Sequence, residues 1–430
     1  MTAIVGVLNK HGVALAADSA VTVNVHNGRK ILNSANKIIR LSKRKPMAIM
    51  IYSGASLLST PWDLIIKMYR DDRVKANFDT GFEYVSDFIT YLKEHDYFSN
   101  KEVEDRHFEK YVLSLYDLVT QNALEEIGSS ITDENKEFLN AKIEEGLKLV
   151  EQHCMKRSRC PDFEDYSFEN FKEEYHQQIY KMLESKIDAS VDKDSRIEVV
   201  ERAIFASIVS SAFIGPMTGL VFVGYGCKEI FPTLVPLNVS LVVSGRLKCA
   251  IDEANIAIIG DGKNQYTASI RPFAQKDVIN TILSGVDDRI HELYVRVTDA
   301  AITNFRQTIA DTVRENEPEN EKVVQTIMGI DTRPIINDII DHLDKFIQRE
   351  YVSQLMDTVE YLDKEDLASM AESLIALTSL KRRMTSSEES VGGPVDVAVI
   401  TKGDGFVWIK HKMYFDKDLN KPYFENYDRD

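Results

Sequence analysis

The sequence has little cysteine, and neither its cysteines nor its histidines are spaced as ligands. Its 430 residues include four cysteines, which are too few and too scattered for a disulfide framework. Cys154 and Cys160 have no second pair near them, which disfavours a zinc site. The nine histidines show no metal-ligand spacing, and no phosphate-binding glycine motif occurs. The sequence therefore predicts no metal, no cofactor and no ATPase activity of its own.

Basic charge is also scarce. The formal net charge is −16, which disfavours binding to nucleic acid, because such binding needs a basic surface. The short basic cluster at residues 43–45 precedes Pro46 and is typical of a solvated turn. With 44% apolar and 28% charged residues, the composition is that of an ordinary globular protein.

Long hydrophobic runs are missing as well. Residues 203–227 carry no charge and are numerous enough to span a membrane, but Pro216 at mid-length and several Ser, Thr and Gly residues favour a buried helix, a turn and a strand. No secretory signal precedes the first apolar run. We therefore expect a cytoplasmic protein that does not contact the membrane.

The first eighteen residues, in contrast, have a clear pattern. Thr2 follows the initiator Met, which is normally removed when the next side chain is small, so Thr2 would become the amino terminus. Residues 2–8 and 13–17 are apolar runs on either side of His11-Gly12, and the second run ends at Asp18. This pattern predicts two short buried strands in a hairpin that brings Asp18 back beside Thr2.

That proximity has chemical meaning. A threonine hydroxyl is a weak nucleophile without a base. The α-amine of the same residue can be that base, because its unperturbed pKa is about 7.7–8.0. A cation would then stabilise the ionised hydroxyl, and a carboxylate would orient the cation. Asp18 can be the carboxylate, and Lys37 is the natural cation.

Five segments now point to a known family. They read T-A-I-V-G-V at 2–7, G-V-A-L-A-A-D-S at 12–19, N-K-I-I-R-L at 36–41, I-Y-S-G-A-S at 51–56 and G-G-P-V-D-V-A-V-I-T-K-G-D-G-F at 392–406. In this order, and with a threonine at position 2, they make the chain resemble the proteasome β-subunit superfamily of N-terminal-nucleophile hydrolases, including the simpler bacterial proteasome-like peptidases. The resemblance implies an α+β fold, a four-layer α-β-β-α sandwich with an inserted helical region.

The resemblance also implies a reaction, that of a threonine-type peptidase or amidohydrolase. Thr2 would attack the amide carbonyl, with Lys37 held by Asp18, and a backbone N–H at Ser53 or Gly54 would bind the oxyanion. The substrate would be a peptide or a protein. Relatives work as rings, so we expect a homo-oligomer, and a separate ATPase or adaptor is a further candidate partner.

Some positions depart from the family pattern. Asp261 stands between two glycines, where many relatives have a serine near the nucleophile's amine. Its carboxylate would accept a hydrogen bond from the ammonium group of Thr2, or it only caps a glycine turn. In the loop before residue 392, Glu389 and Ser390 are candidate supports, although their match to the family pattern is loose and favours a solvated, flexible loop. Ser19, next to Asp18, is a further candidate for a supporting role.

The resemblance covers the chain in pieces, which suggests insertions. Residues 1–70, 195–275 and 360–410 would form the hydrolase core, with strands at 38–41, 47–53, 219–225, 229–234, 239–244 and 256–260 and a first helix from residue 55 to about 70. Residues 20–35 would form an irregular hairpin with its turn at Asn27-Gly28. Residues 395–400 and 406–409 would pair as the last hairpin of the core. Helical apolar spacing predicts a helical insertion at 71–194 and an extended helical segment or second insertion at 276–359. Residues 411–430 would be a C-terminal tail.

Other classes of function stay open from the sequence alone. Taken singly, Thr2, Asp18 and Lys37 are ordinary second-residue, strand-end and surface positions. The chain could be a catalytically inactive structural subunit that keeps the fold, or an interaction protein whose helical insertion binds a partner. It could also hydrolyse small amides, because other N-terminal-nucleophile enzymes share the fold.

Overall fold

The chain forms two compact units in its computed structural model. The structure describes residues 2–25, 28–41, 45–73, 76–95, 100–128, 135–263, 265–385, 392–413, 415–416 and 418–421. The first unit contains residues 1–35, 259–399 and 408–414, and the second contains residues 36–258, 400–407 and 415–430.

The first unit is built on a five-stranded sheet with the strand order β13-β1-β2-β14-β15. Its strands are β1 (Ile4–Asn9), β2 (Gly12–Ala17), β13 (Ala268–Phe273), β14 (Asp396–Thr401) and β15 (Gly405–Lys410). β1 is antiparallel to both β2 and β13. The predicted hairpins at the two ends of the chain are therefore confirmed, and they are neighbours in one sheet; the tip of the β14–β15 hairpin is counted with the second unit.

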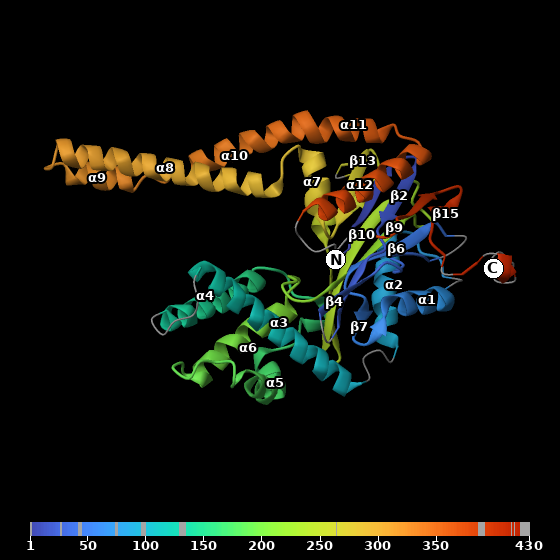
Figure 1. Ribbon diagram of the computed structural model, residues 1–430, viewed down its shortest axis with the longest axis horizontal. Coiled ribbons are helices and arrows are strands. Elements are labelled where there is room, and N and C mark those ends of the chain that lie inside the picture. The colour runs from blue at the N-terminus through green and yellow to red at the C-terminus, as the bar shows by residue number, and fades with distance from the viewer. Residues whose placement is uncertain are drawn as a thin grey trace. The chain divides into compact units, whose positions relative to one another are not determined.

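Helices cover one face of this sheet (Figure 1). They are α7 (Lys276–Ser284), α11 (Gln354–Glu360) and α12 (Lys364–Met384). Small residues on the strands, such as Ala14 and Ala16, let α12 approach closely with Ala368, Ala371 and Ile375. Every residue of β1 and β2 is buried, which explains why both strands read as continuous apolar runs rather than as alternating ones.

Two further parts belong to the first unit. Strands β3 (Val21–Val25) and β4 (Gly28–Leu32) form the hairpin expected for residues 20–35, although Asn27 of its expected turn lies outside the described residues. The segment predicted to be helical at 276–359 begins and ends with α7 and α11 on the sheet, and residues 288–353 between them form an arm in which α8 (Asp288–Asn316) lies beside α9 (Glu321–Met328) and α10 (Arg333–Ile347) (Figure 1). A π-helical turn, Gln348–Ser353, joins α10 to α11.

The second unit is built on a sheet with the strand order β11-β10-β9-β6-β5, and β12 pairs with β10. The strands are β5 (Ile38–Arg40), β6 (Met47–Ser53), β9 (Thr218–Gly224), β10 (Thr233–Val243), β11 (Arg246–Ile251) and β12 (Ala257–Ile258). The strands expected at 229–234 and 239–244 are one strand, β10. Strand β10 continues through Pro236, which has no backbone N–H. Its pairing with β11 begins only at Leu237, so Pro236 leaves no gap in the hydrogen bonds between β10 and β11.

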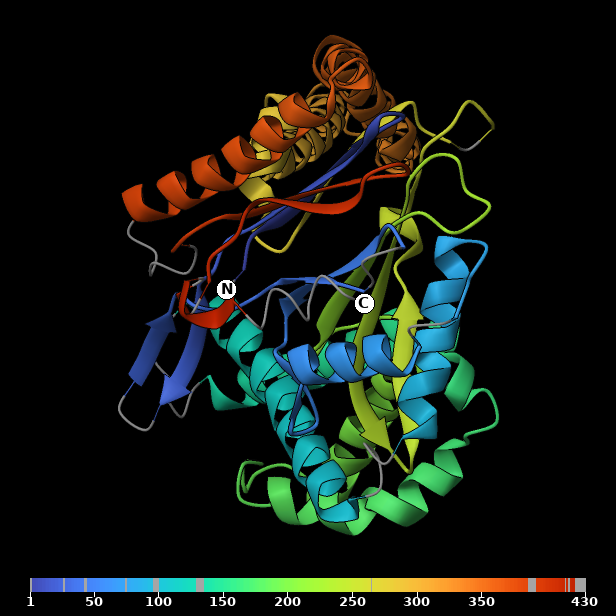
Figure 2. The same ribbon diagram turned by 90° about the vertical axis from the view of Figure 1, so that its right-hand side faces the viewer.

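Helices α1 (Trp62–Asp72) and α2 (Gly81–Glu94) cover one face of this sheet (Figure 2). The expectation that a helix begins at residue 55 was wrong, because β7 (Ser56–Leu57) and β8 (Thr60–Pro61) first form a small ribbon. α1 then buries Trp62, Ile65, Ile66 and Tyr69. Residues 80–94 therefore pack on the sheet, although the sequence placed them in the helical insertion.

The remaining helices of the second unit pack mainly against one another. They are α3 (Lys101–Ile127), α4 (Lys136–Met155), α5 (Phe168–Leu183) and α6 (Lys193–Val209). Their shared core also takes in Leu241 and Val243 near the end of β10. The uncharged stretch at 203–227 is the end of α6, a loop and β9, as the sequence predicted. Within the described part of the chain, no helix is long and apolar enough to cross a membrane.

The chain is thus a mixed α/β protein whose main sheets pair antiparallel strands and carry helices. The stacking of the two main sheets into four layers stays a prediction, and so does the division into a hydrolase core, two insertions and a tail.

Two neighbouring residues of α1 test its burial pattern. Ile65 is fully buried, whereas Leu64 is about half exposed. We expect Ile65→Ala to lower the free energy of unfolding by about 2–5 kcal/mol, because it leaves a cavity. Leu64→Ala is the matched control and should change it by about 0.5 kcal/mol. Urea unfolding followed by the fluorescence of the two tryptophans, Trp62 and Trp408, measures both variants, and equal losses would contradict this packing.

Candidate active site

The first hairpin brings Asp18 to the start of the chain, as the sequence predicted. Ile4 pairs with Ala17 in the β1–β2 register, so Asp18 lies across from Ala3, which directly follows Thr2. The backbone N–H of Asp18 donates to the carbonyl of Ala3 at 3.1 Å. The side chains of Thr2 and Asp18 are both buried.

The Asp18 carboxylate is held by backbone donors from three parts of the first unit. Its Oδ1 accepts the N–H of Ala3 at 2.8 Å. Its Oδ2 accepts the N–H of Ala20 at 3.1 Å and that of Gly392 at 3.3 Å. Hydrogen bonds to a charged acceptor are among the strong ones, so this carboxylate has a fixed position beside the first residues of the chain.

The turn before β14 completes this cluster through Ser19. The Ser19 hydroxyl donates to the carbonyl of Pro394 at 2.5 Å, and the Ser19 N–H donates to the carbonyl of Gly392 at 3.1 Å. Gly393 has a φ of +74°, and a Cβ there would lie 2.9 Å from the Cβ of Asn33, so only glycine fits. Glu389 and Ser390, the candidate supports in this loop, lie outside the described residues.

Lys37 belongs to the second unit, whereas Thr2 and Asp18 belong to the first. Lys37 directly precedes β5, and its carbonyl accepts the N–H of Ile51 at 2.8 Å, which ties it to β6. Its side chain is buried. The catalytic role of Lys37 stays a prediction.

The backbone at the Ser53–Gly54 junction has an unusual conformation. Ser53 ends β6 with a φ of +65°, a left-handed conformation that costs free energy for a residue with a side chain. A Cβ on Gly54 would lie only 2.1 Å from Oγ1 of Thr218. That hydroxyl is held in turn by Trp62, whose Nε1 donates to it at 3.0 Å. The backbone here is therefore strained, and β9 and α1 hold it in place.

The structure does not bring Asp261 to Thr2. Its carboxylate accepts a hydrogen bond from Lys10 Nζ at 2.5 Å, and this contact raises the pKa of the Lys10 ammonium. Lys10 follows the last residue of β1, so Asp261 is separated from Thr2 by the length of that strand, roughly 20 Å. Of the two interpretations of Asp261, the turn between glycines is the one that fits.

Two supporting contacts were missed in the sequence. The bond between Trp62 and Thr218 depends on the β6–β9 register, which pairs Ser53 with Thr218 across 165 positions of sequence that no local pattern connects. The bond from Gly392 to Asp18 was missed because a backbone N–H leaves no trace in a residue pattern. A glycine pair just before a strand is the signal that could have indicated a close backbone approach there.

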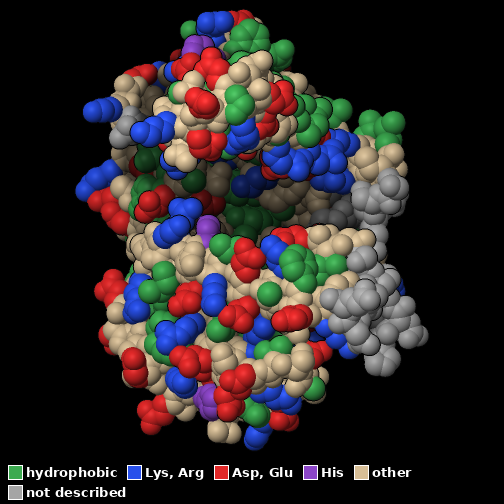
Figure 3. All heavy atoms as spheres, turned by 90° about the vertical axis from the view of Figure 1, so that its left-hand side faces the viewer, with side chains coloured by type: hydrophobic (Ala, Val, Ile, Leu, Met, Phe, Trp, Pro, Cys, Tyr) green, Lys and Arg blue, Asp and Glu red, His purple; other side chains and the backbone are tan. Residues whose placement is uncertain are grey.

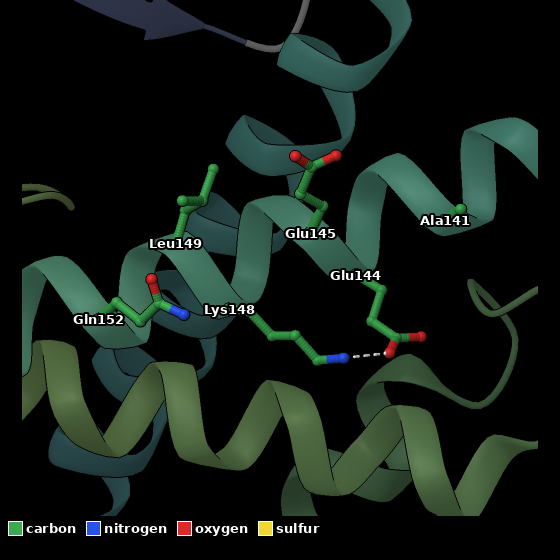
Figure 4. Close-up of a pocket in the computed structure, with 6 residues that line it drawn as sticks. All are labelled: Ala141, Glu144, Glu145, Lys148, Leu149 and Gln152. Carbon is green, nitrogen blue, oxygen red and sulfur yellow. Dashed lines mark hydrogen bonds and ion pairs between the residues drawn. The ribbon is translucent and has the colours of Figure 1, made fainter. Parts of the chain in front are cut away.

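A hollow elsewhere on the surface does not offer comparable chemistry. It lies along one face of α4 and is lined by Ala141, Glu144, Glu145, Lys148, Leu149 and Gln152 (Figure 4). Glu144 and Lys148 form an ion pair one helical turn apart at 2.7 Å, which is typical of a solvated helix surface. Among the described residues, no group of three His, Cys, Asp or Glu side chains could hold a metal ion.

Comparison with known proteins finds only distant likenesses. No family model matches the chain, and no curated protein matches its sequence. The structure of Anbu from Hyphomicrobium sp. strain MC1 is 9% identical, with 99% of this chain and 95% of that chain covered and a TM-score of 0.27. A Gly-1 mutant of Anbu from the same organism is 10% identical, with 100% and 96% covered and a TM-score of 0.25. At this level the likeness assigns neither the fold in detail nor an activity.

Adding a methyl group at position 54 tests how closely the backbone of Gly54 approaches Thr218 of β9. Gly54→Ala should lower the free energy of unfolding by about 1–3 kcal/mol, because the new Cβ overlaps the Thr218 hydroxyl and the turn must shift. Gly403→Ala is the matched control, since a Cβ at Gly403 meets no atom within 4 Å. Chemical denaturation compares the two variants. A Gly54→Ala protein as stable as the control would contradict this geometry.

Proposed function

We propose that the chain is a threonine-type N-terminal-nucleophile hydrolase that cleaves amide bonds in peptides or proteins. Removal of Met1 makes Thr2 the amino terminus. Thr2 Oγ attacks the substrate carbonyl, and the Thr2 α-amine takes the proton, directly or through a water molecule. The amine of the substrate leaves, and water hydrolyses the resulting ester of Thr2.

The fixed Asp18 carboxylate is the observation that carries this proposal. A buried carboxylate with three backbone donors is a costly feature that a plain strand-end turn does not need. It lies one residue from Thr2 across the hairpin, where a group that orients a catalytic cation is required. The proposal assigns that cation to Lys37, and thus requires the two units to bring Lys37 to Thr2 as their sheets stack into a four-layer sandwich.

The strained turn at Ser53 supports a second part of the proposal. An oxyanion needs backbone N–H groups that are rigid before the substrate arrives. Strained residues cluster at functional sites, where the surrounding structure holds them. Ser53 is held by β9, and Gly54 has no side chain to obstruct a peptide, so the N–H groups at this junction are the donors that we assign to the oxyanion.

A peptide epoxyketone tests the nucleophile. This probe reacts with both the hydroxyl and the free amine of an amino-terminal threonine and closes a ring. We expect one adduct per chain in the intact mass of untagged protein, and none in Thr2→Ala. Thr2→Ser should keep the adduct, because it retains both groups. An adduct that persists in Thr2→Ala, or a wild-type chain without Met1 that forms none, would count against the proposal.

Substitution of two aspartates, one at a time, tests whether the charge of Asp18 supports the reaction of Thr2. Asp18→Asn removes the negative charge and replaces one carboxylate oxygen, which accepts backbone N–H groups, by an amide NH₂ group, which cannot accept them. The rate of adduct formation should therefore fall by about 100-fold, which is within the usual range for the loss of an electrostatic support. Asp261→Asn is the matched control and should leave this rate unchanged, because Asp261 pairs with Lys10 at the far end of β1. Equal rates in both variants would contradict the role of Asp18.

A further inference from the structure

Two buried side chains of the second unit hold the turn at Ser53 and Gly54 from the protein interior. Trp62 is the first residue of α1 and Thr218 is the first residue of β9. Trp62 is 1% exposed and Thr218 is 4% exposed. The indole Nε1 of Trp62 donates to the Thr218 Oγ1 at 3.0 Å. We call these two residues the Trp62–Thr218 pair.

Thr218 meets both residues of the turn. It pairs with Ser53 in the antiparallel register of β6 and β9. Its Oγ1 lies 2.1 Å from the position that a Cβ of Gly54 would occupy, and the carbonyl oxygen of Met217 lies 3.1 Å from the same position. The Thr218 hydroxyl therefore fills the space in which residue 54 would otherwise carry a side chain, and it blocks movement of Gly54 toward β9.

Trp62 holds the turn in two ways. An indole N–H can only donate, so its bond to Thr218 fixes the position of the hydroxyl that touches Gly54. In addition, the backbone N–H of Trp62 donates to the carbonyl of Ala55 at 3.0 Å, directly after the turn. The ring of Trp62 packs near that of Phe88 of α2, with 6.4 Å between ring centroids, which places it in the core under the sheet.

Burial distinguishes this pair from the polar side chains on the surface. Over the helices of the second unit, in the lower half of Figure 3, Asp and Glu side chains are interspersed with Lys and Arg side chains, as on a solvated surface. A polar group on such a surface exchanges its partner for water at little cost. A buried donor that loses its acceptor has no such replacement, so the bond between Trp62 and Thr218 keeps one geometry.

We infer that the Trp62–Thr218 pair positions the backbone N–H groups of the Ser53–Gly54 turn for the oxyanion. This inference rests on the proposed function, and it adds that the rate of the reaction depends on a buried side-chain hydrogen bond. A residue with a positive φ, such as Ser53, persists only where its surroundings hold it. Donors for an oxyanion must be fixed before the charge develops, and a shift of about 1 Å can cost roughly 100-fold in rate. Both side chains act through Gly54 and are positioning residues.

Two substitutions of Thr218 separate its hydroxyl from its bulk. Thr218→Val keeps the branched shape but cannot accept from Trp62, whereas Thr218→Ser keeps the hydroxyl. Adduct formation with the peptide epoxyketone is followed by intact mass at several probe concentrations. We expect the maximal rate constant to fall roughly 10- to 100-fold in Thr218→Val and to stay within about twofold in Thr218→Ser. The half-saturating probe concentration should stay within about twofold in both, because the oxyanion forms only as the ketone reacts.

Thr233→Val is the matched control. Thr233 is also buried, and its hydroxyl donates to Glu229 Oε1 at 2.8 Å, so the control likewise loses a buried side-chain hydrogen bond. Thr233 pairs with Gly224 at the other end of β9 from Thr218, far from the turn. Its maximal rate constant should equal that of the wild type, although a merely structural role of Thr218 would make the two valine variants alike.

Trp62→Phe removes the other half of the hydrogen bond and keeps an aromatic ring, so it should lower the same rate constant. Circular dichroism at the assay temperature identifies a variant that does not fold, and Trp62→Phe then decides in place of Thr218→Val. A wild type that reacts, together with an unchanged rate constant in the variant that decides or an equal fall in Thr233→Val, would overturn this inference alone. A wild type that forms no adduct would overturn the proposed function and this inference with it.

Discussion

The Asp18 carboxylate is the contact on which the amino-terminal end of the first unit depends. It joins the residue before β1, the segment that follows β2 and the turn before β14, because Ala3, Ala20 and Gly392 all donate to it. A charged group buried without donors would be very unfavourable, so the three segments must meet around it. The same requirement fixes the immediate surroundings of Thr2. One constraint thus serves both the packing of the sheet and the position of the candidate nucleophile.

Much of the fold could be predicted from the sequence, where local signals were strong. The first hairpin, β6, the long helices and the last hairpin have apolar runs or helical spacing bounded by turn residues. The predicted start of α1 and the predicted length of β10 were wrong, and the sequence analysis missed β11 and β13. In each case the outcome depends on pairing with a distant strand or ribbon: β11 with β10, and β13 with β1. Register between distant segments leaves no local pattern, so such elements are hard to predict.

For the candidate site, too, the positions that depend on local sequence could be predicted, and those that depend on distant segments could not. The closeness of Thr2 and Asp18 followed from a tight hairpin, and Ser19 and the 392–394 turn lie with them. Asp261 was placed by a family pattern, and the structure puts it instead beside Lys10, at the opposite end of β1. Lys37 and the Ser53–Gly54 junction belong to the second unit. The strain at Ser53 could not be predicted, because serine gives no sign of a positive φ.

The most direct test of the account is the intact mass of the untagged, untreated chain. Every catalytic step proposed for Thr2 depends on a free α-amine on that residue. The account predicts a mass that lacks one methionine residue, with Thr2 as the first residue in fragment spectra. A chain that retains Met1 would have no amine on Thr2 to act as the base, and this result would contradict the proposed function.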